Sequence, residues 1–470
     1  MNWTHIWAAV PLGIVLAITA SATKVADTDQ ESPLASESEG RAAPETSAGK
    51  LSPIDETTRR NLVAAAEPFS PTTGPHRLEA FFGSLQRLED PNSTERVHIL
   101  QLGDSHTAGD ALTGQLRRRF QDEFGDGGRG YAPPGVPWRG YSQEAMSWAT
   151  SGGWRAHLAI RNDDHGPWGI AGVRMDTYGP GTWVQRGTCE YCDGGEAFDA
   201  FSVHFLRQPG GGSFEIQVDG RNVNTVSTAG PRGMDVVHGR VPEGPHELRI
   251  KTTSAGPVGL FGISTRRGNE GLVYSNVGLN GATAGDFGEA IGPLARAELR
   301  RLSPELLVFA FGTNGAYNLH EFARRYADNP RAIQQQRRRW AADYRRTLRR
   351  TMDVVGQASC LVLTPPDLSG GDAHGGRPAA LNFVIDTQHR VADDLGCAVW
   401  NQSTAMGGPG SIERWAQKNP RWAQTDGKHL TVRGYRAVAD RLYGDLMDAY
   451  QRWLSGTGRG LPTRRVATRP

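Results

Sequence analysis

The chain has 470 residues, with 52 lysines and arginines against 50 aspartates and glutamates, and a formal net charge of +2. So balanced a charge gives no electrostatic reason for a nucleic-acid partner, and we expect none. The length allows one or two domains with tails, and the 59 glycines and 28 prolines indicate many turns without reaching low complexity.

The first 22 residues, MNWTHIWAAVPLGIVLAITASA, hold an apolar run that ends in the small-residue pattern of a signal-peptide cleavage site. No lysine or arginine precedes the run, so an uncleaved membrane anchor is the alternative. Both interpretations predict a periplasmic or otherwise exported protein, with a membrane tether in the second case. No later run approaches the roughly 20 apolar residues of a spanning helix.

Residues 23–75 are rich in alanine, serine, threonine, glutamate and proline, which predicts a disordered linker. A folded domain is expected to begin with residues 76–130. Helical apolar spacing over 76–90 precedes a buried strand in RVHILQLGDS and a helix in ALTGQLRRRFQDEFG. This is the opening strand–turn–helix unit of a parallel sheet.

Residues 131–270 contain short segments of aromatic and β-branched residues separated by turn residues, for example FDAFSVHFLRQ, GSFEIQVDG and HELRIKTTS. Such spacing is typical of a β-sandwich. Residues 271–455 return to strands alternating with helices, including one helix expected over 285–302 and an arginine-rich helix over 331–350. We therefore predict an α/β domain interrupted by an inserted β-sandwich, with a basic tail at 456–470.

Four cysteines are consistent with an oxidising compartment. Cys189 and Cys192 could close a small loop, or form half of a zinc site, although no second ligand pair follows at a suitable spacing. Cys360 and Cys397 each lie beside a predicted strand, so a disulfide and two buried thiols are both open.

Ser105, in ILQLGDSHTAGD, lies on the turn after the first buried strand and before a helix. Ester hydrolysis by a serine needs a base in hydrogen-bond reach, a carboxylate that orients the base, and donors for the oxyanion. Asp104 is expected to cap the helix that follows. The turn alone does not distinguish a nucleophile from an ordinary polar residue.

Candidate partners follow later strands or precede the last helix. Asp426 and His429 are three residues apart in QTDGKHLTVRGY, Asn314 follows an apolar strand in VFAFGTN, and Gly281 lies in SNVGLNGATA. Each pattern alone has an ordinary explanation as a helix cap or a turn. Together they would converge on one edge of the sheet.

The blocks GDSH, NGAT, GTN and DGKHLT, in this order, resemble those of the SGNH/GDSL hydrolase family over residues 97–130 and 270–445. The resemblance implies a flavodoxin-like three-layer fold, with Ser105 as nucleophile, His429 as base and Asp426 as its orienting carboxylate. It also implies an oxyanion hole made by Ser105, Gly281 and Asn314. The chemistry needs no metal or other cofactor, and we expect none.

GDSHTAGD, the inserted sandwich and STAMGGPGSIERW resemble the bacterial peptidoglycan O-acetylesterases. That resemblance implies a jelly-roll, carbohydrate-binding-like insert and removal of the C6 O-acetyl group of N-acetylmuramic acid in peptidoglycan. It also suggests Met406, Gly407 and Gly408 as substrate-binding residues. His106 could shape the substrate pocket as well, or have a capping or packing role. An O-acetyltransferase, an esterase for another acetylated glycan and a glycan-binding scaffold are the alternatives.

Overall fold

The computed structural model describes residues 72–90, 92–161, 165–189, 192, 194–369 and 378–457. The expected signal peptide or anchor, most of the linker and all but the first residues of the basic tail lie outside these ranges. None of the helices in the described part combines the length and apolar character needed to cross a bilayer. The first strand, β1 (Thr72–Thr73), is already part of a sheet, ahead of the expected domain start at residue 76.

A parallel sheet of five strands forms the centre of the α/β part, with β1 added antiparallel at one edge. The spatial order is β14-β2-β15-β16-β17, so the strands are arranged 2-1-3-4-5 when numbered along the chain. Their bounds are β2 (Arg96–Gly103), β14 (Gly271–Gly278), β15 (Leu306–Ala310), β16 (Ser359–Leu363) and β17 (Ala398–Trp400).

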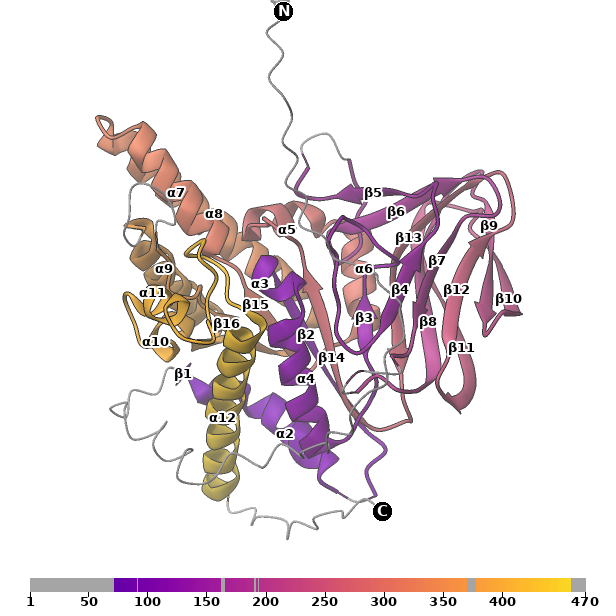
Figure 1. Cartoon of the computed structure of the whole chain (residues 1–470), viewed down its shortest axis with the longest axis horizontal. Coiled ribbons are helices and arrows are strands. Elements are labelled where there is room, and N and C mark those ends of the chain that lie inside the picture. The colour runs from indigo at the N-terminus through magenta and orange to yellow at the C-terminus, as the bar shows by residue number, and fades with distance from the viewer. Residues whose placement is uncertain are drawn as a thin grey trace, which may run out of the picture. The chain divides into compact units, whose positions relative to one another are not determined.

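Helices cover both faces of this sheet, as the near-continuous apolar strands predict (Figure 1). Ile99 of β2 packs into one buried apolar cluster and the next residue, Leu100, into the other. The first cluster includes α2 (Glu79–Leu88), α4 (Ala111–Phe124) and α12 (Val432–Gly456). The second includes α5 (Ala284–Ala290), α6 (Pro293–Leu302), α8 (Pro330–Val355) and α9 (Ala380–Leu395).

The remaining helical segments lie at strand ends and in loops. They are η1 (Pro75–Leu78), α3 (Ser105–Ala108), α7 (Thr313–Arg325), α10 (Gln402–Ala405) and α11 (Ser411–Ala416).

The single helix expected over 285–302 is wrong, because α5 ends at Ala290 and α6 begins at Pro293. Proline has no backbone N–H to donate to the preceding turn, whereas it fits the first position of a new helix. The break turns the chain between two helices that both pack on the same face of the sheet.

Two antiparallel sheets occupy the chain between α4 and β14, and the expected mixed α/β architecture is confirmed. One has the order β10-β9-β12-β7-β4 and the other β11-β8-β13-β6-β5, with β3 also paired to β13. Their bounds are β3 (Gly130–Ala132), β4 (Ser147–Thr150), β5 (Arg155–Leu158), β6 (Val173–Tyr178), β7 (Trp183–Gly187), β8 (Phe198–Arg207), β9 (Ser213–Val218), β10 (Arg221–Ser227), β11 (Gly233–Gly244), β12 (Glu247–Thr252) and β13 (Pro257–Arg266).

The two sheets share one apolar core. Val203 of β8 and Ile263 of β13 come from one sheet, and Phe214 of β9 and Ile250 of β12 from the other, and all four are completely buried. Buried residues alternate with partly exposed ones along β9 and β12, whereas β8 and β13 are buried along nearly their whole length. The region is a sandwich that joins the α/β part through β3 and the start of β14.

Both cysteine pairs form disulfides. Cys360 and Cys397 lie at the neighbouring strands β16 and β17, so their bridge fastens two adjacent parts of the central sheet. Cys189 and Cys192 close a short loop that follows β7. The alternatives of a half zinc site and of two free thiols therefore do not hold in this structure.

Candidate active site

Ser105 is the first residue of α3, at the carboxyl end of β2. Asp104 caps this short helix: its Oδ1 accepts a hydrogen bond from the His106 N–H at 3.1 Å. The turn requires glycine at position 103, since a Cβ there would lie 2.1 Å from the Thr107 Oγ1 and 2.8 Å from the Ala310 carbonyl oxygen. The local sequence therefore holds the Ser105 hydroxyl at the edge of the sheet where ligands bind in open α/β folds.

The structure brings Ser105, His429 and Asp426 into one hydrogen-bonded chain. The Ser105 Oγ lies 2.9 Å from the His429 Nε2, and the His429 Nδ1 lies 2.6 Å from the Asp426 Oδ2. A carboxylate accepts only, so the His429 Nδ1 carries the proton toward Asp426 and the Nε2 is free to accept from the hydroxyl. In this tautomer His429 can take a proton from Ser105.

Asp426 is held ionised by its own loop. Partial burial acts to raise its pKa, but hydrogen bonds from the His429 ring and from the His429 and Lys428 backbone N–H groups lower the pKa below its ordinary value. The same two backbone bonds, each 2.9 Å, fix the carboxylate relative to the imidazole. About two fifths of each side chain is exposed, 43% for Asp426 and 38% for His429, so a substrate can reach the pair from solvent.

Gly281 lies on the loop between β14 and α5, and Asn314 is the second residue of α7, which follows β15. The Leu279 N–H donates to the Gly103 carbonyl at 3.1 Å, which fastens the β14–α5 loop to the Ser105 turn. The Asn314 Nδ2 donates to the Ala282 carbonyl at 2.9 Å, so one amide hydrogen orients the side chain and the second is available. Gly281 has a φ of +82° with open space around its Cα, a conformation that favours glycine.

The backbone N–H groups of Ser105 and Gly281 donate no hydrogen bond within the described residues. Backbone N–H groups without an internal acceptor can donate to a bound ligand. With the second amide hydrogen of Asn314, this part of the molecule offers three N–H donors.

His106 is packed behind the exposed pair. Its Nδ1 lies 2.9 Å from the Tyr435 hydroxyl, and its ring centroid is 5.3 Å from that of His429. Burial lowers the pKa of His106 to about 3, so the ring is neutral and adds no positive charge next to His429. Its Nε2 is buried with no partner among the described residues.

The other expected substrate-binding residues form no hydrogen bond with Ser105, His429 or Asp426 within the described ranges. Met406 is 5% exposed and packs in the apolar cluster that includes α12. Gly407 and Gly408 follow it with positive φ angles, and the Gly407 carbonyl accepts from Arg414 at 2.9 Å. These two glycines shape the turn between α10 and α11.

A buried polar network supports the Ser105 turn from behind, and the sequence analysis did not predict it. Asp110, fully buried after α3, accepts hydrogen bonds from Arg117 at 2.8 Å and from Arg129 at 2.9 Å. Asn276 of β14 donates both to Asp110 and to the Thr107 carbonyl. The second aspartate of GDSHTAGD was the available signal, but nothing local marks distant arginines as its partners.

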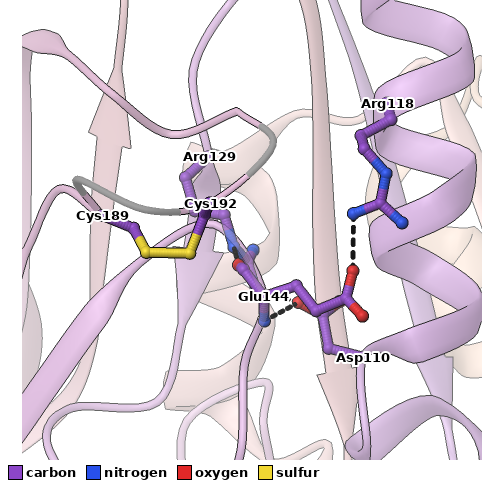
Figure 2. Close-up of a disulfide and its surroundings, with 6 residues drawn as sticks. All are labelled: Asp110, Arg118, Arg129, Glu144, Cys189 and Cys192. Atoms are coloured by element: carbon purple, nitrogen blue, oxygen red, sulfur yellow. Dashed lines mark hydrogen bonds and ion pairs between the residues drawn. A yellow bond between two sulfur atoms is a disulfide. The ribbon is translucent and has the colours of Figure 1, made fainter. Parts of the chain in front are cut away.

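This network reaches the inserted sandwich. The Glu144 N–H donates to Asp110 at 2.8 Å, and the Glu144 carboxylate accepts from Arg118 at 2.6 Å. Figure 2 shows these two contacts and, in the same view, the Cys189–Cys192 disulfide. Gly195, whose carbonyl accepts from the Cys189 N–H at 3.1 Å, lies against Ala145: a Cβ on Gly195 would be 2.0 Å from the Ala145 carbonyl oxygen. The chain beside the Cys189–Cys192 bridge thus packs next to Glu144, which supports the Ser105 turn through Asp110.

The described residues contain no group of three or more histidine, cysteine, aspartate or glutamate side chains placed to hold a metal ion. Asp367 is one buried carboxylate in this part of the molecule; it is fully buried, and its Oδ2 accepts a hydrogen bond from the Ile412 N–H at 3.3 Å.

The sequence matches no protein-family profile and no curated protein. The structure is similar to a solved peptidoglycan O-acetylesterase, at 26% sequence identity and a TM-score of 0.64, over 79% of this chain and 96% of that chain. Two weaker likenesses each have a TM-score of 0.27. One is to a family two carbohydrate esterase from Cellvibrio japonicus, at 12% identity over 66% of this chain and 99% of that chain. The other is to a lipase/acylhydrolase from Enterococcus faecalis, at 20% identity over 39% of this chain and 78% of that chain. The first of these comparisons confirms the resemblance predicted from the sequence.

Proposed function

We propose that this chain, a carboxylic ester hydrolase that resembles the SGNH/GDSL family, removes O-acetyl groups from a bacterial polysaccharide. The observation that carries the proposal is the hydrogen-bonded chain from the Ser105 hydroxyl through His429 to Asp426. The N–H donors beside Ser105 add the second requirement of acyl transfer, a place for negative charge on the carbonyl oxygen.

In the proposed mechanism the Ser105 Oγ attacks the acetyl carbonyl carbon while its proton passes to the His429 Nε2. The carbonyl π electrons move to oxygen, and the N–H groups of Ser105 and Gly281 and the amide of Asn314 stabilise this oxyanion. Collapse of the tetrahedral intermediate breaks the bond to the sugar oxygen, which takes the proton from His429. Asp426 stabilises the imidazolium throughout.

The second half of the reaction repeats these steps with water. Water gives a proton to His429 and attacks the acetyl-Ser105 carbonyl, and collapse of that intermediate releases acetate and restores the Ser105 hydroxyl with the proton from His429. A sugar hydroxyl in place of water would transfer the acetyl group instead. The exposure of His429 and Asp426 leaves the site open to water.

For the substrate we propose the C6 O-acetyl group of N-acetylmuramic acid in peptidoglycan. The support is the likeness to a peptidoglycan O-acetylesterase over nearly all of that protein. We assign His106 to the wall of the acyl pocket, since it packs beside His429, and we assign Gly407 and Gly408 to the glycan side of the site. Met406 would act by supporting their turn.

We further infer a flavodoxin-like, three-layer α/β fold with an inserted jelly-roll. The 2-1-3-4-5 strand order and the helices on both faces support the first part, and the two facing antiparallel sheets support the second. A carbohydrate-binding role for the insert and export to the periplasm remain part of the proposal. Two disulfides favour an oxidising compartment.

The test is mass analysis of muropeptides from O-acetylated peptidoglycan before and after treatment with the enzyme. We expect loss of one acetyl mass from muramic acid-containing fragments, with an equivalent amount of acetate released. Ser105→Ala should leave the fragments unchanged. Acetylated fragments that persist with wild-type enzyme would contradict the substrate, and acetyl groups recovered on a glycan acceptor would indicate transfer rather than hydrolysis.

A further inference from the structure

A polar cavity of about 300 Å³ lies at the opposite end of the parallel sheet from Ser105. It separates the outer face of the β11-β8-β13 sheet from the start of β2 and the end of α6, and Arg96, Ser264 and Glu305 are among its lining residues. Arg96 begins β2 and Ser105 follows the end of that strand, so the two are separated by the length of β2, roughly 23 Å.

The strand register gathers polar side chains on this face of the sheet. His238, Ser202 and Ser264 are paired across the three strands in one row. Two residues along each strand, Arg240, Ala200 and Arg266 form the next row. Residues two apart share a face of a strand, so the two rows lie on one face of the sheet. Ser202, Ser264 and Arg266 line this cavity, whereas Ala200 and Arg240 line a smaller adjoining one.

The positive charges of the cavity exceed its negative charges. Arg266 and Arg301 form no hydrogen bond or ion pair with any described residue, and neither guanidinium is neutralised there. Arg240 lies 3.5 Å from Asp199 and 3.1 Å from the Asn269 side chain. Arg96 donates to the Gly268 carbonyl, a neutral acceptor.

Glu305 lines the cavity, Asp199 lies beside Arg240, and Glu298 lies 3.0 Å from the Nδ1 of His204 in the cavity wall. Glu305 is occupied by the His98 N–H, which donates to its Oε2 at 2.6 Å, and burial raises the pKa of Glu305. Burial and then the neighbouring arginines lower the pKa values of Arg96 and Arg266, and the opposing effect of Asp199 is too small to cancel this.

Hydroxyl and imidazole groups add to these cations. The Ser264 Oγ is buried without a partner among the described residues, and Ser264 is 7% exposed. The Ser202 Oγ lies 2.8 Å from the His238 Nδ1, which fixes that ring against the cavity wall. A buried hydroxyl without a partner is costly, and a ligand that also contacts the neighbouring guanidinium groups would satisfy it.

We propose that this cavity binds a phosphate group, with Arg96, Arg266 and Arg301 as its main cationic contacts and the Ser264 hydroxyl as a further donor. Guanidinium groups bind phosphate oxygens through paired charge-assisted hydrogen bonds. A phosphate presents more acceptor oxygens than a carboxylate, and it carries enough negative charge to balance several arginines. The site is separate from the Ser105 site, so the proposal does not depend on the esterase function.

The experiment is isothermal titration calorimetry of the purified protein with sodium phosphate, at constant ionic strength, with sodium acetate as the comparison anion. The wild type should bind phosphate and bind acetate far more weakly. Arg266→Gln removes a charge that has no partner in the protein, so it should fold normally. It should weaken phosphate binding by about tenfold or more, because one charge-assisted contact is lost.

Two further variants make the test decisive. Arg221→Gln removes an exposed arginine at the start of β10, on the other sheet of the sandwich, and should bind phosphate as the wild type does. Arg301→Gln should weaken binding and replaces Arg266→Gln if that variant fails to fold. The proposal is overturned if the wild type binds no phosphate, if acetate binds equally well, or if both cavity variants bind phosphate like the wild type. If both cavity variants bind phosphate like the wild type, the phosphate binds elsewhere on the protein, for example at the Ser105 site.

Discussion

Helix α3 is flanked by two buried aspartates, and only one of them has cationic partners. Asp104, before the helix, is 1% exposed and has no cation beside it, and burial raises its pKa to about 7. Asp110, after the helix, is fully buried, but Arg117 and Arg129 more than offset the burial and lower its pKa. Burial alone therefore does not decide the charge of a carboxyl group; its cationic partners do.

The difference separates two tasks around Ser105. The ionised Asp110 is the centre of a network that joins α4, β14 and the inserted sandwich. Asp104, next to Ser105, is largely protonated below neutral pH. In that state it caps α3 without adding negative charge next to the site where we propose an oxyanion forms.

Removing the Asp110 charge should have the largest effect on stability. Asp110→Asn leaves Arg117 and Arg129 buried without a counter-charge, and we expect a loss of about 3–5 kcal/mol in the free energy of unfolding. Urea unfolding at neutral pH measures it. Asp104→Asn is the matched control, since it replaces a buried carboxyl group that has no cationic partner. Equal losses in the two variants would contradict the comparison.

Asp104 should make stability depend on pH in a definite direction. Its pKa is raised in the folded protein, so its contribution is fully present below the ordinary value of 3.8 and is lost as the pH rises through about 7. The loss amounts to up to about 4 kcal/mol. Unfolding free energies measured between pH 4 and 8 should fall more steeply for the wild type than for Asp104→Asn. Parallel curves would show that Asp104 does not titrate in this range.

The hydrogen bond between Tyr435 and His106 should have the smallest effect. Tyr435→Phe removes the hydroxyl partner of a buried neutral imidazole, and we expect a loss of about 1 kcal/mol. Tyr326→Phe is a suitable control, because Tyr326 is 43% exposed. Chemical unfolding of both variants measures the difference. If Tyr435→Phe loses no more stability than the control, the hydrogen bond between Tyr435 and His106 does not stabilise the protein.

Short-range patterns in the sequence were enough for the main features of the sheet and for the proposed catalytic residues. Ser105, Gly281 and Asn314 each follow an apolar strand, and parallel strands end at one edge of a sheet, so their proximity could be expected. The pairing of Cys360 with Cys397 depended on which strands are neighbours, and β16 and β17 are adjacent.

Long-range polar contacts were not predictable in the same way. Arg117 lies in a run of three arginines that resembles a solvated helix face, yet it is 2% exposed and paired with Asp110. Arg96 and Arg266 come together only through the placement of the sandwich against β2. Such contacts depend on sheet register and on the docking of distant segments, which apolar periodicity does not encode.

The central claim is that Ser105 carries the acyl group, and active-site labelling with a fluorophosphonate tests it most directly. Intact-mass analysis of the wild type should show one added phosphonyl group, and peptide mapping should locate it on Ser105. Ser105→Ala should take up no label and release no acetate from an aryl acetate. A label on another residue, or full acetate release by Ser105→Ala, would contradict the account.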